Sequence, residues 1–227
     1  MYKKILLVFI LSHNLIFSQF NNLQNFDQRD FRFGYFIGIN QYDNRVDYKN
    51  YTDYPISIDR SEGINVGLIG ELKLNENLFL SIEPGLHANK KNITFNERQF
   101  FTNYSDTLWT VKANNIHIPF LLKYSSKRLG NFRPYLKAGL STSINLNEIE
   151  GNLSNYGLDN FKLQKFNFYY ELAFGIDFYL RYFKFSPSIR GVFSLKNELP
   201  KNTPENPWTR NIDKFLTRAV FINFSFY

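Results

Sequence analysis

The segment KFNFYYELAFGIDFYLRYF, residues 165–183, restricts the possible folds more than any other part of the sequence. Large apolar residues occupy every second position, and most positions between them are polar or small. Successive side chains of a β-strand point to opposite faces, so a period of two predicts a long strand with one apolar face and one polar face. The apolar positions are Phe166, Phe168, Tyr170, Leu172, Phe174, Ile176, Phe178 and Leu180.

The same period recurs along the chain and predicts an all-β, antiparallel, up-and-down structure of about eight strands, with no convincing amphipathic helix. Short connections at residues 75–77, 125–131 and 181–182 alternate with long polar ones at residues 41–62, 88–110, 147–164 and 196–216. We expect parts of the long connections, such as KKNITF and TLWTVK, to continue strands as a protruding hairpin. The other predicted strands lie within residues 31–39, 64–74, 78–86, 116–124, 132–144, 183–195 and 220–226.

Alternation alone is compatible with a lipocalin-like soluble barrel or a sandwich, and three features favour a transmembrane β-barrel instead. The strands are long enough to cross a bilayer, which takes about 9–11 residues of tilted strand. The polar face is rich in glycine, which suits the crowded interior of a narrow barrel. The chain also begins like a secreted protein and ends in an aromatic strand, as in bacterial outer-membrane barrels. The glycines are Gly34, Gly38, Gly63, Gly67, Gly85, Gly139 and Gly175.

The N-terminus resembles a secretory signal peptide. Lys3 and Lys4 precede an apolar run, which ends before Ser18 and Gln19. This order of a basic region, a short apolar region and a small residue is typical of a cleaved signal. We therefore expect a signal peptide over residues 1–18 and an outer-membrane barrel domain over residues 19–227. Cysteine is absent, which excludes disulfides and thiolate chemistry.

An eight-stranded barrel is just wide enough to hold its own side chains. The polar faces place acidic and basic residues in that interior, where they must pair. We expect a charged network that fills the lumen, and an open channel is the less favoured alternative. The inward positions are Arg32, Lys73, Lys123, Arg133, Lys137, Arg181, Lys184, Arg190, Glu71, Glu83, Glu171 and Asp177.

No motif predicts an enzyme, a cofactor or a metal site. Ser81, His87 and His117 are the residue types that a lipid-A deacylase would need, but no spacing ties them together. The net charge of +7 is scattered, so no basic stripe predicts nucleic-acid binding. No small-molecule substrate is indicated, and outer-membrane lipid is the expected surrounding partner.

One loop, LPKNTPENPWTRNIDKF over residues 199–215, is the most distinctive of the long connections. Its prolines stiffen it, and Trp208 and Arg210 belong to residue types that are favoured at binding hot spots. We therefore predict a partner contact at Pro207, Trp208 and Arg210. A folded lid over the barrel mouth is the alternative.

Two segments, NNLQNFDQRDFRFGYFIGIN at residues 21–40 and the tail at residues 186–226, resemble the PorT (also SprT) family of Bacteroidota outer-membrane β-barrels. In the tail, Asn-Pro-Trp-Thr, Asn-Ile-Asp and the last strand carry the resemblance. It implies a non-catalytic accessory or assembly role in type IX protein secretion and gliding motility, with secretion-system proteins as partners. From the alternation of short and long connections, we expect both termini in the periplasm and the long loops facing outward. The alternatives are a generic small barrel that binds through its outer loops and a lipid-A-modifying enzyme. One departure is Tyr227, which falls on the lumen-facing phase, so Phe226 is the final lipid-facing aromatic.

Overall fold

A computed structural model describes residues 22–51, 57–58, 60–94, 108–146, 164–199 and 212–227. These residues form one antiparallel sheet and a short 3-10 turn, η1 (Phe26–Gln28). No helix among them is long and apolar enough to cross a membrane. The strands are β1 (Phe31–Tyr48), β2 (Ser57–Ile58), β3 (Ser61–Lys73), β4 (Leu78–Ile82), β5 (Gly85–Thr94), β6 (Leu108–Ser125), β7 (Phe132–Asn145), β8 (Phe166–Tyr179), β9 (Lys184–Ser194) and β10 (Ile212–Phe226).

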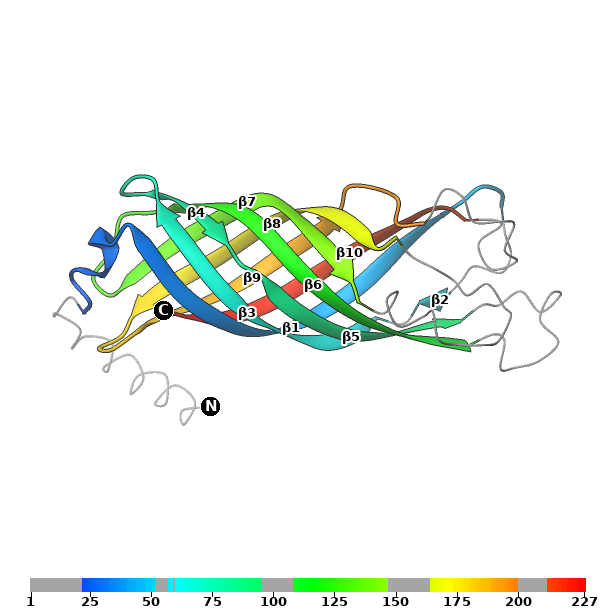
Figure 1. Ribbon diagram of the computed structural model, residues 1–227, viewed down its shortest axis with the longest axis horizontal. Coiled ribbons are helices and arrows are strands. Elements are labelled where there is room, and N and C mark those ends of the chain that lie inside the picture. Colours follow the sequence, from blue (N-terminus) through cyan, green and yellow to red (C-terminus); the bar gives the residue numbers. More distant parts are fainter. Residues whose placement is uncertain (1–21, 52–56, 59, 95–107, 147–163, 200–211) are drawn as a thin grey trace, which may run out of the picture.

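The sheet closes on itself as a barrel. From β6 to β10 each strand pairs with the next one along the chain, and β1 pairs both with β3 and with β10, which joins the two ends of the sheet (Figure 1). The ten strand segments occupy eight positions around the barrel, because β4 and β5 both lie between β3 and β6, and β2 extends the pairing of β3 with β5. The predicted meander of about eight strands is confirmed.

The break between β4 and β5 falls at Glu83 and Pro84. Proline has no N–H to give to the sheet, but its carbonyl still accepts a hydrogen bond from the N–H of Leu68, at 2.9 Å. The Glu83 N–H donates to the carbonyl of Pro119 at 3.3 Å. These two bonds carry the pairing across the break, so the barrel wall stays closed.

The two ends of the barrel differ in their connections. The short connections at residues 74–77, 126–131 and 180–183 lie at one end, together with the start of β1 and the end of β10; we call this the turn end. The opposite end is the loop end (Figure 1). Several expected long connections prove to be shorter than predicted, because β1 continues to Tyr48 and β5 and β6 pair as far as Thr94 and Leu108. This confirms the predicted extension of strands beyond the regular pattern.

The apolar faces point outward and the polar faces inward. On β8, Leu172 is 57% exposed while its neighbour Glu171 is 1% exposed. On the other long strands, nearly all the large exposed hydrophobic side chains also lie at outward-facing positions. A soluble barrel buries its apolar face, so this arrangement requires an apolar surrounding and confirms the transmembrane interpretation.

This polarity reverses toward the loop end on β1 and β10. The outward residues there form ion pairs, with Arg218 at 3.4 Å from Asp43 and Arg45 at 3.0 Å from Asp47. The inward side chains of Val46 and Phe215 instead join a buried apolar cluster with Leu199 and Ile212. A polar exterior over an apolar interior is the pattern of a protein in water. The reversal therefore marks where the barrel leaves the hydrocarbon layer.

Lumen-facing glycines lie where neighbouring groups approach closely. A Cβ on Gly85 would lie 2.7 Å from the ring of Phe36, and one on Gly67 would lie 2.5 Å from the same ring. A Cβ on Gly175 would lie 2.4 Å from the ring of Tyr135. Glycine is needed here because large aromatic side chains cross the narrow lumen, as the sequence predicted.

Candidate functional site

The N-terminal segment, residues 22–30, folds across the turn end of the barrel. Phe26 is buried there, edge-on to the rings of Tyr179 and Tyr227 at 6.3 and 6.5 Å. The Lys184 Nζ lies 5.0 Å from the centre of the Phe26 ring. An aromatic ring with cations over its face gains a cation–π attraction in addition to its hydrophobic burial. We call this segment and its contacts the turn-end seal.

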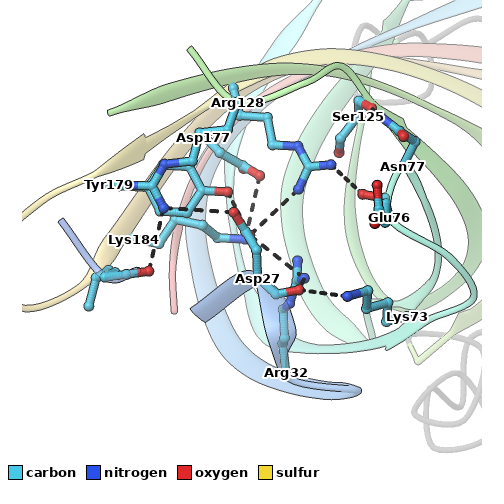
Figure 2. Close-up of polar contacts among 12 residues, drawn as sticks. Asp27, Arg32, Lys73, Glu76, Asn77, Ser125, Arg128, Asp177, Tyr179 and Lys184 are labelled. Carbon is cyan, nitrogen blue, oxygen red and sulfur yellow. Dashed lines mark hydrogen bonds and ion pairs between the residues drawn. The ribbon is translucent and has the colours of Figure 1, made fainter. Parts of the chain in front are cut away.

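Asp27 is the centre of the seal (Figure 2). Its carboxylate accepts a hydrogen bond from the Tyr179 hydroxyl at 2.8 Å. It also lies 3.5–3.7 Å from guanidinium nitrogens of Arg32, Arg128 and Arg133. Its backbone carbonyl accepts a hydrogen bond from the Lys73 Nζ at 2.9 Å. One residue thus joins five side chains from separate parts of the barrel.

The segment is also held by its backbone. Arg128 donates hydrogen bonds to the carbonyls of Asn22 and Leu23, the latter at 3.4 Å. The Asn22 N–H donates to the side-chain carbonyl of Asn131 at 2.8 Å, and the Asn22 side chain donates to the Tyr179 carbonyl at 3.1 Å. These bonds tie the segment to two of the short turns.

Replacing Asp27 with alanine should loosen the seal. The three guanidinium groups would lose their shared carboxylate, and we expect a destabilisation of about 1–3 kcal/mol confined to this end, as for removing a partner of charged hydrogen bonds. Hydrogen exchange followed by mass spectrometry should show faster exchange at residues 22–30. Asp30→Ala, at an exposed neighbouring position, is the control. Equal exchange rates in the two variants would contradict a central role for Asp27.

A charged cluster fills the barrel lumen on the loop-end side of the seal. The Lys123 Nζ lies 3.1 Å from the Glu71 carboxylate and 3.0 Å from that of Asp177. Lys184 lies 3.5 Å from Asp177 and 3.9 Å from Glu71. The Tyr227 hydroxyl donates a 2.7 Å hydrogen bond to Glu71, so Tyr227 does point into the lumen.

A second group of ion pairs continues the cluster toward the loop end. Glu83 contacts both Lys137 and Arg190. Arg190 reaches on to Glu171 at 3.3 Å, and Glu171 in turn lies 2.6 Å from the Nε2 of His117. Buried charges are tolerated when they are paired in this way. The predicted lumen network is therefore confirmed.

A layer of rings lies next to this network. The rings of His87 and His117 are 4.9 Å apart, and Phe221 stands edge-on to both. The Nδ1 of His87 is 3.4 Å from the Tyr42 hydroxyl. Ser81 donates a 2.8 Å hydrogen bond to Glu83, so its hydroxyl is oriented toward a carboxylate rather than toward a histidine.

The described residues contain no group of three or more His, Asp or Glu side chains arranged to hold a metal ion. All the buried acidic groups named above have cationic or hydrogen-bonding neighbours. What this arrangement does chemically is hold the barrel wall together from inside and close its lumen to solvent.

One inward assignment needs correction. Arg181 is exposed, because β8 ends at Tyr179 and the chain turns before it can reach the lumen. Lys73 does point inward, to the carbonyl of Asp27 in the seal, but it is only half-buried because it lies at the last position of β3. The other ten predicted lumen residues are buried. The period-two alternation correctly predicts that these ten side chains face the lumen. It does not apply to residues that lie beyond the end of a strand.

The sequence analysis did not predict the seal, because residues 22–30 lack the period-two alternation of apolar and polar residues that marks a β-strand. A possible signal was the acidic Asp27 close to Phe26, directly before the first strand. The predicted signal peptide at residues 1–18 and the predicted contact residues Pro207, Trp208 and Arg210 lie outside the described residues.

A closed antiparallel ring with an apolar exterior and a charge-filled interior defines a small transmembrane β-barrel. The chain belongs to the outer membrane protein beta-barrel domain family, whose model matches residues 17–199. It is therefore a protein of the bacterial outer membrane, embedded in membrane lipid. No curated protein matches the chain.

Several solved structures are similar. OprG of Pseudomonas aeruginosa is 13% identical, with a TM-score of 0.44 over 86% of this chain and 93% of that one. Neisserial surface protein A is 8% identical, with a TM-score of 0.44 over 84% and 95%. Ail of Yersinia pestis, in complex with a heparin analogue, is 9% identical, with a TM-score of 0.41 over 87% and 99%.

Proposed function

We propose that the barrel is a non-catalytic accessory or assembly component of type IX protein secretion, with a linked role in gliding motility. The resemblance of residues 21–40 and 186–226 to the PorT family supports the assignment to this system. The first of these segments includes the turn-end seal, so the residues that carry the resemblance also make specific contacts in the barrel.

The filled lumen is the observation that carries the non-catalytic, contact-based part of the proposal. Charged and aromatic side chains occupy the interior, and Lys123, Lys184 and Glu71 have almost no exposed surface. A secreted protein cannot pass through such an interior. The barrel's contribution to secretion is therefore assigned to its outer surfaces, where a partner can bind.

The proposal includes the topology that was expected from the sequence. Residues 1–18 act as a signal peptide, residues 19–227 form the mature barrel, and both termini lie in the periplasm. The long connections then face outward, and the turn-end seal faces the periplasm. A cysteine-accessibility experiment tests this orientation: in intact cells, a membrane-impermeant thiol reagent should label Lys49→Cys at the loop end and leave Lys127→Cys at the turn end unlabelled.

The decisive experiment is a clean deletion in the native bacterium. Proteins with the C-terminal sorting domain should accumulate in the periplasm and decrease in the medium, while unrelated outer-membrane barrels keep their normal abundance. Unchanged export of the sorting-domain proteins would contradict the secretion role. A generic barrel that binds through its loops would then be the better description.

Within this function, Trp208→Ala should reduce export without lowering the amount of folded barrel, because tryptophan is among the residue types that are favoured at binding hot spots. Trp109→Ala changes the other tryptophan and serves as the matched control. Export at the wild-type level from the Trp208 variant would remove the loop from the proposed interface. Mass spectrometry of lipid A in the deletion strain tests the enzyme alternative, for which the acyl chains should change.

A further inference from the structure

The segment that forms the turn-end seal is held as a bound peptide is held, and not as part of the sheet. Among the described residues, the backbone–backbone hydrogen bonds of residues 22–29 are all internal to that segment. Each hydrogen bond between the segment and the barrel uses at least one side chain, such as those of Arg128 and Lys73. Direct backbone pairing with the wall begins at Asp30, whose carbonyl accepts a 2.8 Å hydrogen bond from the Lys73 N–H. Asp30 is therefore the point at which the segment is tethered to the barrel.

The contacts of the segment are concentrated in two adjacent residues. Phe26 is buried and Asp27 is half-buried. Leu23 has a φ of 51°, in the left-handed region that a leucine rarely adopts. The docked shape of the segment is therefore imposed by its contacts with the barrel. The residues around the two contact residues are exposed: Gln24, Asn25 and Gln28.

The barrel surrounds the Asp27 carboxylate with donors that need an anion (Figure 2). Guanidinium nitrogens of Arg133 and Arg128 lie 3.5 and 3.7 Å from it, and the Tyr179 hydroxyl donates a 2.8 Å hydrogen bond to it. Within the part of the chain that the structure describes, no other carboxylate lies within 4 Å of either guanidinium group. Residues 1–21, which precede the segment, contain no acidic residue. Without Asp27 this place would require another anion, because cations removed from water must be paired.

Next to the carboxylate lies a place for one aromatic ring. The Phe26 ring is edge-on to the rings of Tyr179 and Tyr227. The Lys184 Nζ and the Arg32 guanidinium carbon lie 5.0 and 5.4 Å from the centre of the Phe26 ring. Cations attract the face of an aromatic ring, so this place favours an aromatic side chain over an aliphatic one. The two places together select an aromatic residue that is followed directly by an acidic one.

We propose that this site at the turn end recognises a segment of a partner protein in which an aromatic residue is followed by an acidic residue, and that residues 22–29 are its tethered occupant. The partner segment binds by displacing Phe26 and Asp27, while Asp30 keeps the displaced residues attached to the barrel. A short tether gives the occupant a roughly millimolar effective concentration, so a partner must make further contacts to compete with it. The binding goes beyond the role in secretion and does not depend on it; only the side of the membrane from which the partner arrives follows from the proposed orientation.

A peptide supplied in trans tests this proposal. In the full mature barrel, Phe26→Ala and Asp27→Ala together leave the site without its occupant. Binding of a fluorescent peptide with the sequence of residues 22–30, blocked at both ends, is followed by anisotropy in detergent. We expect saturable binding of one peptide per barrel, at least about tenfold tighter than to the wild type, in which the tethered segment competes. The absence of saturable binding to the folded variant would overturn the proposal.

Two altered peptides test the chemistry of the site. Asp27→Asn in the peptide should weaken its binding about tenfold, because the neutral amide loses the charge-assisted hydrogen bonds of the carboxylate. Asp30→Asn in the peptide removes the same charge at a position that is exposed in the barrel, and it is the matched control. Equal affinities of the two altered peptides would show a general attraction between charges and would overturn the recognition of an acid at this place.

Hydrogen exchange in the wild-type barrel gives a second measurement, which does not depend on the folding of the variant. The unaltered peptide at roughly 10 mM, above the effective concentration of the tethered segment, should displace that segment and speed exchange at residues 22–29. The Asp27→Asn peptide at the same concentration should leave the exchange slow. Exchange that neither peptide changes would mean that the segment is a fixed part of the barrel, and the proposal would be wrong.

Discussion

Replacing Glu71 with alanine should destabilise the barrel by about 3–5 kcal/mol, the typical cost of breaking a buried ion pair by removing one partner. Glu71 lies within 4 Å of cationic nitrogens of Lys123, Lys137, Lys184 and Arg32. Without it, four buried cations would have only the remaining acidic side chains to balance them. The loss should therefore exceed that of an ordinary surface substitution, which is usually within about 0.5 kcal/mol.

Urea unfolding of the purified barrel, followed by circular dichroism in detergent or lipid vesicles, measures this difference. Glu76→Ala, at an exposed position in the adjacent turn, is the control and should unfold like the wild type. Combining Glu71→Ala with Lys123→Met should recover part of the lost stability, because the second change removes one of the uncompensated charges. A Glu71 variant as stable as the control would mean that the network adds little to stability.

A positive charge at Leu172 should cost about 2–4 kcal/mol, the range measured for arginine on the lipid face near the bilayer midplane. Leu172 is 57% exposed and lies near the middle of the apolar row of β8. In water the same substitution at an exposed position would be nearly neutral. Leu172→Arg therefore distinguishes a lipid surrounding from an aqueous one by a single measurement of stability.

The destabilisation caused by a lipid-facing arginine depends on its depth in the bilayer, and this dependence provides the control for the second experiment. Asn114 is exposed on β6, beyond the apolar band toward the loop end. Arginine at this position should cost about 0–1 kcal/mol, as found near the interfaces. Folding in vesicles followed by urea titration would compare the two variants. Equal stabilities would argue against a bilayer around β8.

Much of the fold could be predicted because a β-barrel repeats a single local rule. Period-two alternation placed Lys123, Glu171 and Asp177 on the inner face, and the structure buries all three. The same rule placed Leu172 and Phe174 outside. The rule is local, so it needs no knowledge of which strands are neighbours.

Partner choice inside the lumen could not be predicted in the same way. Lys123 and Glu71 are 52 residues apart in the chain, and their contact depends on the stagger of the strands around the ring. The seal was missed because Phe26 and Asp27 belong to an irregular segment. Its position depends on cations from Arg128 and Arg133, which the chain brings to this end only when the barrel has closed.

The distribution of lumen charges among the strands has a consequence for how the protein is assembled. The hairpin of β6 and β7 contains no acidic residue, but it carries the buried Lys123, Arg133 and Lys137. The acidic Glu71 and Glu83 come from the wall formed by β3 to β5. A β6–β7 hairpin that entered the bilayer alone would bring three uncompensated cations with it. Stepwise insertion is therefore unfavourable, and the hairpins should meet before any of them crosses, so that the membrane receives an almost complete, charge-balanced cylinder.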